Sequence, residues 1–146
     1  MKYLLLGFAF TLIFAGASFA QTEKQKMKFA GEIKEVLTLQ TAAWNQGDID
    51  GFMQGYWNSP QLVFVGGANV TRGWQPTLEH YKKKYDSRAK MGVLTFSDLE
   101  VEVLSKDSAV VLGSWALQAQ NNPHGKFTLI FRRFKDGWKI VHDHTS

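Results

Sequence analysis

The stretch Asp136-Gly137-Trp138-Lys139-Ile140-Val141-His142-Asp143-His144-Thr145-Ser146 predicts a tight turn followed by a β-strand. Asp-Gly is typical of two-residue hairpin turns, because both central positions of such a turn require φ > 0. Successive residues of a strand point to opposite faces, so we expect Asp143 on one face and four residues on the other: Trp138, Ile140, His142 and His144. Two imidazoles and a carboxylate make this the densest cluster of titratable groups in the chain.

The sequence before this strand predicts three more strands. Residues 99–103 alternate apolar side chains with glutamates, as a strand with one solvated face does. Residues 109–120 and 127–134 carry apolar side chains on both faces, which indicates strands covered on two sides. We therefore expect an antiparallel sheet from Gly92 onward.

Helices are predicted in the first half of the chain. Apolar residues spaced three and four apart predict a first helix up to about residue 46, with Gly47 as its C-terminal cap. Asp48 is suited to cap a short second helix. Residues 62–65 predict an apolar strand, and the segment from Gly66 to Gly73 a loop.

Pro76 fits the first turn of a third helix. Helices followed by strands indicate an α+β fold. We expect a cone-shaped roll, in which three N-terminal helices pack on a curved antiparallel sheet that encloses a cavity.

The first twenty of the 146 residues predict a secretory signal peptide. Lys2 gives it a positive start, an apolar run follows, and small residues precede Gln21. A permanent membrane anchor is the alternative, but the apolar run is short for a membrane span. We expect cleavage after residue 20, a flexible leader over 21–28, one domain over 29–146, no stable membrane anchor, and a periplasmic or secreted location.

Composition narrows the function further. The chain has no cysteine, which rules out disulfides and thiolate nucleophiles. The net charge of +4 owes much to the run Lys82-Lys83-Lys84, which is typical of a solvated helix face. No basic and aromatic module accompanies this run, so no nucleic-acid partner is predicted. Phosphate-binding glycine loops and the serine-hydrolase elbow are also absent from the sequence.

Three motifs carry a family resemblance. The sequence Trp44-Asn45-Gln46-Gly47-Asp48-Ile49-Asp50-Gly51-Phe52 resembles the junction of the first two helices in the nuclear-transport-factor-2-like superfamily, in its SnoaL-like and ketosteroid-isomerase-like branch. The Arg72-Gly73 turn and the terminal run from Gly137 to Ser146 are similar to other marks of that branch. The resemblance extends over nearly all of residues 30–146. It implies the cone-shaped fold and a homodimer through the sheet. It leaves the activity open, because the superfamily includes isomerases, cyclases, dehydratases and transport factors.

The isomerase mechanism implied by part of this branch is not supported by the residues. It uses an aspartate base together with a tyrosine and a neutral carboxylic acid. In the register of the resemblance, the tyrosine position falls on Gln40 and the base position on or beside Phe64. Steroid isomerisation by that set of groups is therefore not predicted.

Other residues are candidates for a site. His142 or His144 is expected to act as a general acid or base, with Asp143 orienting it, if the protein is an enzyme. Candidates for ligand binding are mainly aromatic: Gln40, Trp44, Tyr56, Phe64, Arg72, Tyr81 and Trp115. Arg72 is suited to clamp a carboxylate, or to pair with an exposed acid.

A metal site is a further alternative for the last strand. Two imidazoles on one strand face lie close enough to share an ion, but the sequence places no third ligand beside them. We therefore predict neither a metal nor a cofactor.

The sequence predicts an exported protein that binds a small apolar or aromatic molecule in an aromatic cavity and forms a homodimer through its sheet. One alternative is a cofactor-independent acid/base enzyme of the isomerase, cyclase or dehydratase type that uses a histidine of the last strand. A second is a structural or dimerising domain without a ligand.

Overall fold

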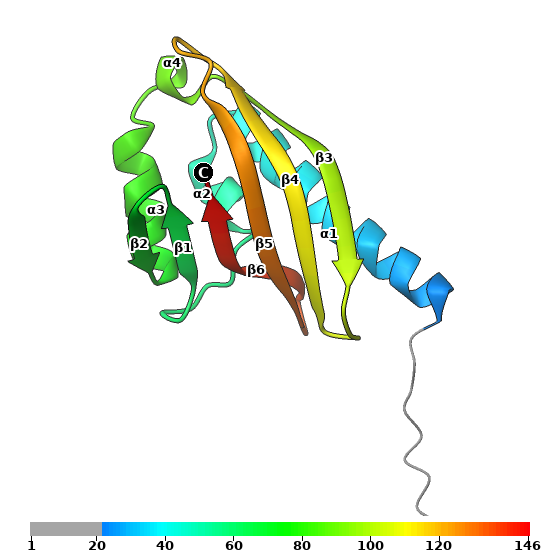
Figure 1. The fold of residues 1–146 in the computed structure, drawn as a ribbon. Coiled ribbons are helices and arrows are strands. Elements are labelled where there is room, and N and C mark those ends of the chain that lie inside the picture. Colours follow the sequence, from blue (N-terminus) through cyan, green and yellow to red (C-terminus); the bar gives the residue numbers. More distant parts are fainter. Residues whose placement is uncertain (1–21) are drawn as a thin grey trace, which may run out of the picture.

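A computed structural model of the chain describes residues 22–146, so the predicted signal peptide lies outside the described residues (Figure 1). The helices are α1 (Glu23–Asn45), α2 (Ile49–Met53), α3 (Trp74–Lys84) and α4 (Arg88–Met91). The strands are β1 (Val63–Gly66), β2 (Asn69–Arg72), β3 (Val93–Val103), β4 (Ser108–Gln118), β5 (His124–Phe134) and β6 (Gly137–Thr145). The predicted α+β fold, with helices packed on a curved sheet, is confirmed.

The six strands form one mixed sheet in the order β2-β1-β6-β5-β4-β3. The antiparallel sheet predicted from Gly92 onward is confirmed for β3 to β6. Strand β1, which precedes it in the chain, runs parallel to β6 and pairs Val63 with His142. The segment predicted as a loop after Gly66 contains β2, which pairs with β1 as an antiparallel hairpin. This hairpin extends the sheet on the side of α3 (Figure 1).

Helix α1 begins at Glu23, earlier than predicted, and includes most of the segment expected to be a flexible leader. The side chain of Thr22 caps it by accepting a hydrogen bond from the backbone N–H of Gln25. Most of residues 23–28 are exposed, so this extension has no apolar periodicity by which the sequence could signal it. The following turns bury Phe29, Ile33 and Leu37 against the sheet.

The junction of α1 and α2 is fixed by its own side chains. Gly47 follows α1 with φ 85°, and Asp48 accepts a hydrogen bond from the backbone N–H of Gly51 at 2.8 Å. Both predicted caps are therefore confirmed. The Asn45 side chain accepts from the N–H of Leu94 and donates to its C=O, so it satisfies both backbone groups at the edge of β3. The indole N–H of Trp44 donates to the carbonyl of Met91.

Strand β6 contains a β-bulge that the sequence did not reveal. Phe131 of β5 pairs with Ile140 and Ile130 pairs with His142, so Val141 is an extra residue without a partner. An extra residue reverses the alternation beyond it. Asp143 therefore shares the inner face with Ile140, and the prediction that both histidines share that face is wrong.

The hairpin turn before β6 also lies one residue earlier than predicted. Phe134 pairs with Gly137, so the two loop residues are Lys135 and Asp136. Only Gly137 adopts positive φ here, at 112°. Within residues 22–146, no helix has both the length and the apolar character needed to cross a membrane.

Candidate functional site

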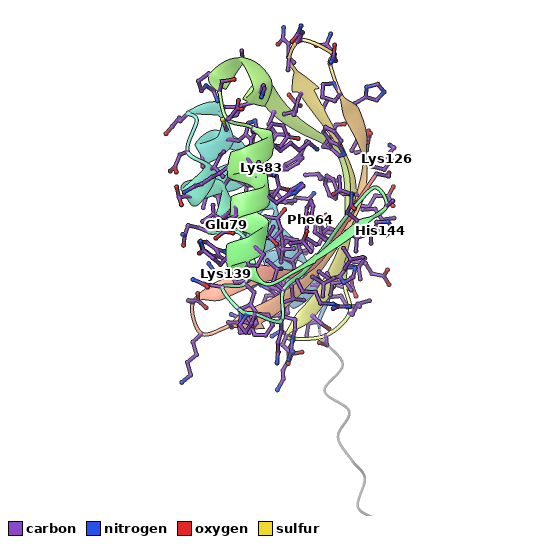
Figure 2. All side chains as sticks on the ribbon, turned by 90° about the vertical axis from the view of Figure 1, so that its left-hand side faces the viewer. Phe64, Glu79, Lys83, Lys126, Lys139 and His144 are labelled. Atoms are coloured by element: carbon purple, nitrogen blue, oxygen red, sulfur yellow. The ribbon has the colours of Figure 1, made fainter. Side chains whose placement is uncertain are left out.

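The inner face of the sheet and the helices enclose a cavity of about 300 Å³. Its walls come from the inner faces of α1, α2 and α3 and from the six strands of the sheet. Most of the lining side chains are aromatic or aliphatic. Figure 2 shows Phe64 in the space between α3 and the sheet. Such a volume lies at the lower end of the range of small-molecule sites.

One carboxyl group, that of Asp143, faces into this cavity and is only 3% exposed. Its Oδ2 accepts a hydrogen bond from the Tyr56 hydroxyl at 2.7 Å, and its Oδ1 accepts one from the Thr145 hydroxyl at 2.6 Å. The hydroxyls of Tyr56 and Tyr81 lie 3.4 Å apart. We call Asp143, Tyr56, Tyr81 and Thr145 the polar cluster of the cavity.

Burial controls the titration of this cluster. Loss of water around the carboxyl raises the pKa of Asp143 to about 6, although hydrogen bonds from Thr145 and Tyr56 and the charge of His144 oppose the rise. Burial, and then the negative charge of Asp143, raise the pKa of Tyr56 and of Tyr81 well above the usual value of 10.0. Both tyrosines are therefore neutral proton donors near neutral pH.

Six of the seven residues predicted to bind ligand line the cavity: Gln40, Trp44, Tyr56, Phe64, Tyr81 and Trp115. Their role in binding stays a prediction. Arg72 is exposed on β2 and does not line the cavity. Gln40 is 2% exposed and donates from Nε2 to the carbonyl of Phe52 at 3.0 Å, which ties α1 to α2. Its amide lies so close to Gly55 that a Cβ there would meet it at 2.5 Å.

His142 and His144 lie on the outer face of the sheet and do not line the cavity. His142 pairs with Ile130 and His144 with Thr128, and Ile130 is 38% exposed. Figure 2 shows His144 and Lys126 on the side of the sheet away from α3. The three candidates of the last strand are thus split between two faces.

The sequence analysis missed several residues of the site. Thr145 lies two residues after Asp143 and reaches its carboxyl along the same face, but a single threonine in a strand gives no signal of this role. Lys84 and His80 of α3 line the cavity, although the lysine run predicts only a solvated surface. Tyr85 also lines it and packs against Trp44, with ring centroids 4.8 Å apart.

A metal site has no support in the part of the chain that the structure describes. Among residues 22–146, no three His, Asp or Glu side chains converge in a group that could hold an ion. The opposed directions of Asp143 and the two histidines account for this at the last strand.

Comparisons with known proteins agree with this architecture. A family model described as a SnoaL-like domain matches residues 33–146. Among solved structures, the chain is similar to an NTF-2-like protein of unknown function from Shewanella oneidensis MR-1. The two are 39% identical with a TM-score of 0.77, and the match covers 80% of this chain and 98% of that chain. No curated protein matches the chain in sequence.

More distant structures share the fold alone. One is a nuclear transport factor 2-like superfamily protein from Salmonella enterica serovar Typhimurium LT2, 21% identical with a TM-score of 0.65, matched over 82% of this chain and 91% of that one. Another is a putative dehydratase of the NTF2-like family from Streptomyces avermitilis, 18% identical with a TM-score of 0.66, matched over 82% and 97%. The predicted superfamily resemblance is confirmed.

Proposed function

The chain belongs to the SnoaL-like domain family, and we propose that its aromatic cavity binds a small apolar or aromatic molecule. The observation that carries this proposal is the polar cluster set in an otherwise largely apolar cavity. A few convergent polar groups within apolar walls are the usual design of a small-molecule site. A cavity of about 300 Å³ has room for about ten water molecules, which corresponds to a ligand of one or two rings.

A matched pair of variants on β4 tests this proposal. Leu117 lines the cavity and is 3% exposed, whereas Leu112 on the outer face is 47% exposed. Leu117→Trp fills the cavity, so we expect it to weaken binding of the neutral probe 1-naphthylmethanol at least about tenfold, or about 1.4 kcal/mol. Leu112→Trp adds the same bulk outside the cavity and should leave binding unchanged. Quenching of tryptophan fluorescence or equilibrium dialysis measures both.

The proposal fails if the unmodified protein shows no saturable binding, or if Leu117→Trp binds as well as Leu112→Trp. Thermal unfolding of each variant confirms that a loss of binding does not come from unfolding. The same pair separates ligand binding from a purely structural role, in which both changes would affect stability alone.

A second candidate function, acid/base catalysis in the cavity, is favoured by the hydrogen-bonded carboxyl of Asp143. A carboxylate with a pKa of about 6 is a better general base near neutral pH than an ordinary aspartate. Tyr81, whose hydroxyl lies 3.4 Å from that of Tyr56, is a neutral donor suited to stabilise an oxygen on which charge develops. Catalysis in the cavity would therefore use Asp143 in place of the predicted histidines.

Proton exchange at carbon tests this second candidate. We expect the protein to accelerate the exchange of the α-protons of 2-tetralone in D2O, followed by NMR, and Asp143→Asn to abolish the acceleration. His144→Gln is the control, because His144 lies outside the cavity. Exchange at the buffer rate with the unmodified protein removes this candidate and leaves the binding proposal intact.

We also propose a homodimer through the outer face of the sheet. Two cross-strand rows run over this face, one through Glu100, Leu112, Thr128 and His144, the other through Glu102, Val110, Ile130 and His142. Each row has an acid on the edge strand β3 and a histidine on β6, with Leu112 and Thr128 between them in one row and Val110 and Ile130 in the other. A two-fold axis parallel to the strands would set the acids of one copy against the histidines of the other.

Light scattering after size exclusion tests the dimer. We expect a dimer for the unmodified protein and a monomer for Ile130→Asp, which places a charge in the middle of one row. Leu39→Asp on α1 is the control, because Leu39 is 61% exposed but lies on a helix away from the outer face. A monomeric unmodified protein overturns the proposal.

Export is proposed on the sequence of residues 1–20. We expect the intact mass of the protein recovered from the periplasmic fraction of a bacterial host to correspond to a chain that begins at Gln21. Retention of the full-length mass in that fraction, or confinement to the cytoplasm, contradicts the proposal.

A further inference from the structure

The buried carboxyl of Asp143 forms no ion pair with a side chain of the described residues. Among residues 22–146, the ion pairs lie at the surface and none of them includes Asp143. A buried carboxylate is costly unless it is paired or fully hydrogen-bonded. A cationic group of a ligand placed beside Asp143 would therefore offset the cost of burying this carboxylate.

The carboxyl group of Asp143 is arranged to accept hydrogen bonds from a ligand and not to donate one. Each of its two oxygens already accepts a hydrogen bond from a hydroxyl, Oδ2 from Tyr56 and Oδ1 from Thr145. Donors directed at both oxygens favour the ionised form of a carboxyl. Each carboxylate oxygen retains a second acceptor position, which a ligand N–H can occupy.

Aromatic rings surround the same end of the cavity. The ring centroids of Phe52 and Tyr56 are 5.8 Å apart, and Tyr81 lies 5.3 Å from Phe52 and 5.5 Å from Phe64. Aromatic ring faces attract organic cations through their quadrupoles, and the attraction increases where water is excluded. The carboxylate and the rings thus favour the same sign of ligand charge.

We propose that the cavity selects a small organic monocation, a protonated amine or a cationic heteroaromatic ring carried on an apolar body of one or two rings. This inference rests on the proposed function, because it names the ligand class of the same cavity. The cationic group lies against Asp143 and the ring faces, and the apolar body fills the remaining volume.

The lining also includes Lys84 and His80, which favour a negative charge. Both are exposed, and the Nζ atom of Lys84 lies 5.2 Å from the ring centroid of Tyr85. Water and salt screen exposed charges more than buried ones. We therefore expect Asp143 to dominate the selection.

A series of three probes with one ring system and three charges tests this inference. The probes are 1-naphthylmethylamine, 1-naphthylmethanol and 1-naphthoate, measured by calorimetry at about pH 7.5, where the amine is protonated. We expect the amine to bind at least about tenfold more tightly than the alcohol, and the naphthoate to bind most weakly. Asp143→Asn should remove the preference for the amine and leave the affinity for the alcohol within about threefold. His144→Gln is the control and should keep the ranking.

The possible outcomes separate the two proposals. Binding of the alcohol without a preference for the amine, or tightest binding of the naphthoate, overturns the cation inference and leaves the proposed function in place. Failure of all three probes to bind overturns the proposed function, and the inference falls with it. If Asp143→Asn does not fold, the ranking of the three probes on the unmodified protein still decides the question.

Discussion

The two faces of strand β6 carry titratable side chains in different environments. On the inner face, Trp138 and Asp143 are each 3% exposed, and burial raises the pKa of Asp143 to about 6. On the outer face, His142 is half-buried and His144 is exposed. A single extra residue, Val141, determines which of these groups meets the cavity. In this strand, a residue is therefore a candidate for the site because its side chain faces the cavity, and not because of its residue type.

The largest effect is expected from placing a charge on each face at adjacent positions of β5. Leu129 is 3% exposed and lines the cavity, whereas Thr128 is paired with His144 on the outer face. Leu129→Glu buries a second carboxylate directly opposite Asp143, so we expect a loss of more than about 4 kcal/mol of unfolding free energy, or failure to fold. Thr128→Glu should cost less than about 1 kcal/mol. Urea unfolding followed by circular dichroism measures both, and equal losses would contradict the assignment of the faces.

Much of the architecture could be predicted because the signals are local. Gly47 and Asp48 cap their helices as the sequence indicated, since capping depends on the conformation and hydrogen bonding of a few adjacent residues. The inner faces of α1 and α2 also followed from spacing. For that reason the sequence alone was sufficient to place Gln40 and Trp44 toward a cavity.

The parts that could not be predicted depend on partners distant in the sequence. The bulge at Val141 exists only in the pairing with β5, and no residue type at this position signals it. The parallel pairing of β1 with β6 joins segments about eighty residues apart, which no local pattern encodes. The sequence therefore predicts that Asp143 orients a histidine, whereas in the fold Asp143 is itself the residue that reaches the cavity.

The pH dependence of stability is expected to show the next largest effect. The folded pKa of Asp143, about 6, lies above its usual value of 3.8, so folding favours the protonated carboxyl. The resulting stabilisation is complete below about pH 3.8 and is lost as the pH rises through about 6, and it amounts to about 3 kcal/mol. Asp143→Asn lacks this titration. We expect the stability of the unmodified protein to fall relative to Asp143→Asn by about this amount between about pH 4 and pH 8.

Asp98 offers a control of opposite sign for this measurement. It is exposed, and hydrogen bonds from Ser114, followed by the charge of Lys126, lower its pKa. The variant Asp98→Asn should therefore show the same fall in unfolding free energy between acidic and alkaline pH as the unmodified protein. Parallel stability profiles for the unmodified protein and Asp143→Asn would show that Asp143 titrates as an ordinary aspartate.

The two tyrosines of the polar cluster, Tyr56 and Tyr81, should differ by a smaller amount in their effect on stability. Tyr56→Phe removes the donor at 2.7 Å from Asp143 and leaves a buried oxygen without this partner, so we expect a loss of about 1–3 kcal/mol at neutral pH. Tyr81→Phe removes only the 3.4 Å contact with the Tyr56 hydroxyl and should cost less. Chemical unfolding of the two variants gives the comparison. A larger loss of unfolding free energy for Tyr81→Phe than for Tyr56→Phe would show that the hydrogen bond from Tyr56 to Asp143 is not the main one of the polar cluster.

Deletion of Val141 should have the smallest effect, although it removes a residue from a central strand. Val141 has no partner in β5, so its removal joins Ile140 directly to His142 and converts the bulge into a regular pairing. In that pairing Ile140 and Asp143 still face inward, and the pairing of His142 with Val63 is preserved. We expect a loss of about 1 kcal/mol from the altered twist, and a pH profile of stability that keeps the contribution of Asp143. Deletion of Lys139, which is paired with Arg132, is the matched control and should be far more damaging, because it shifts the strand between two paired positions. If the two deletions were equally damaging, Val141 would have a role in β6 beyond that of an unpaired extra residue.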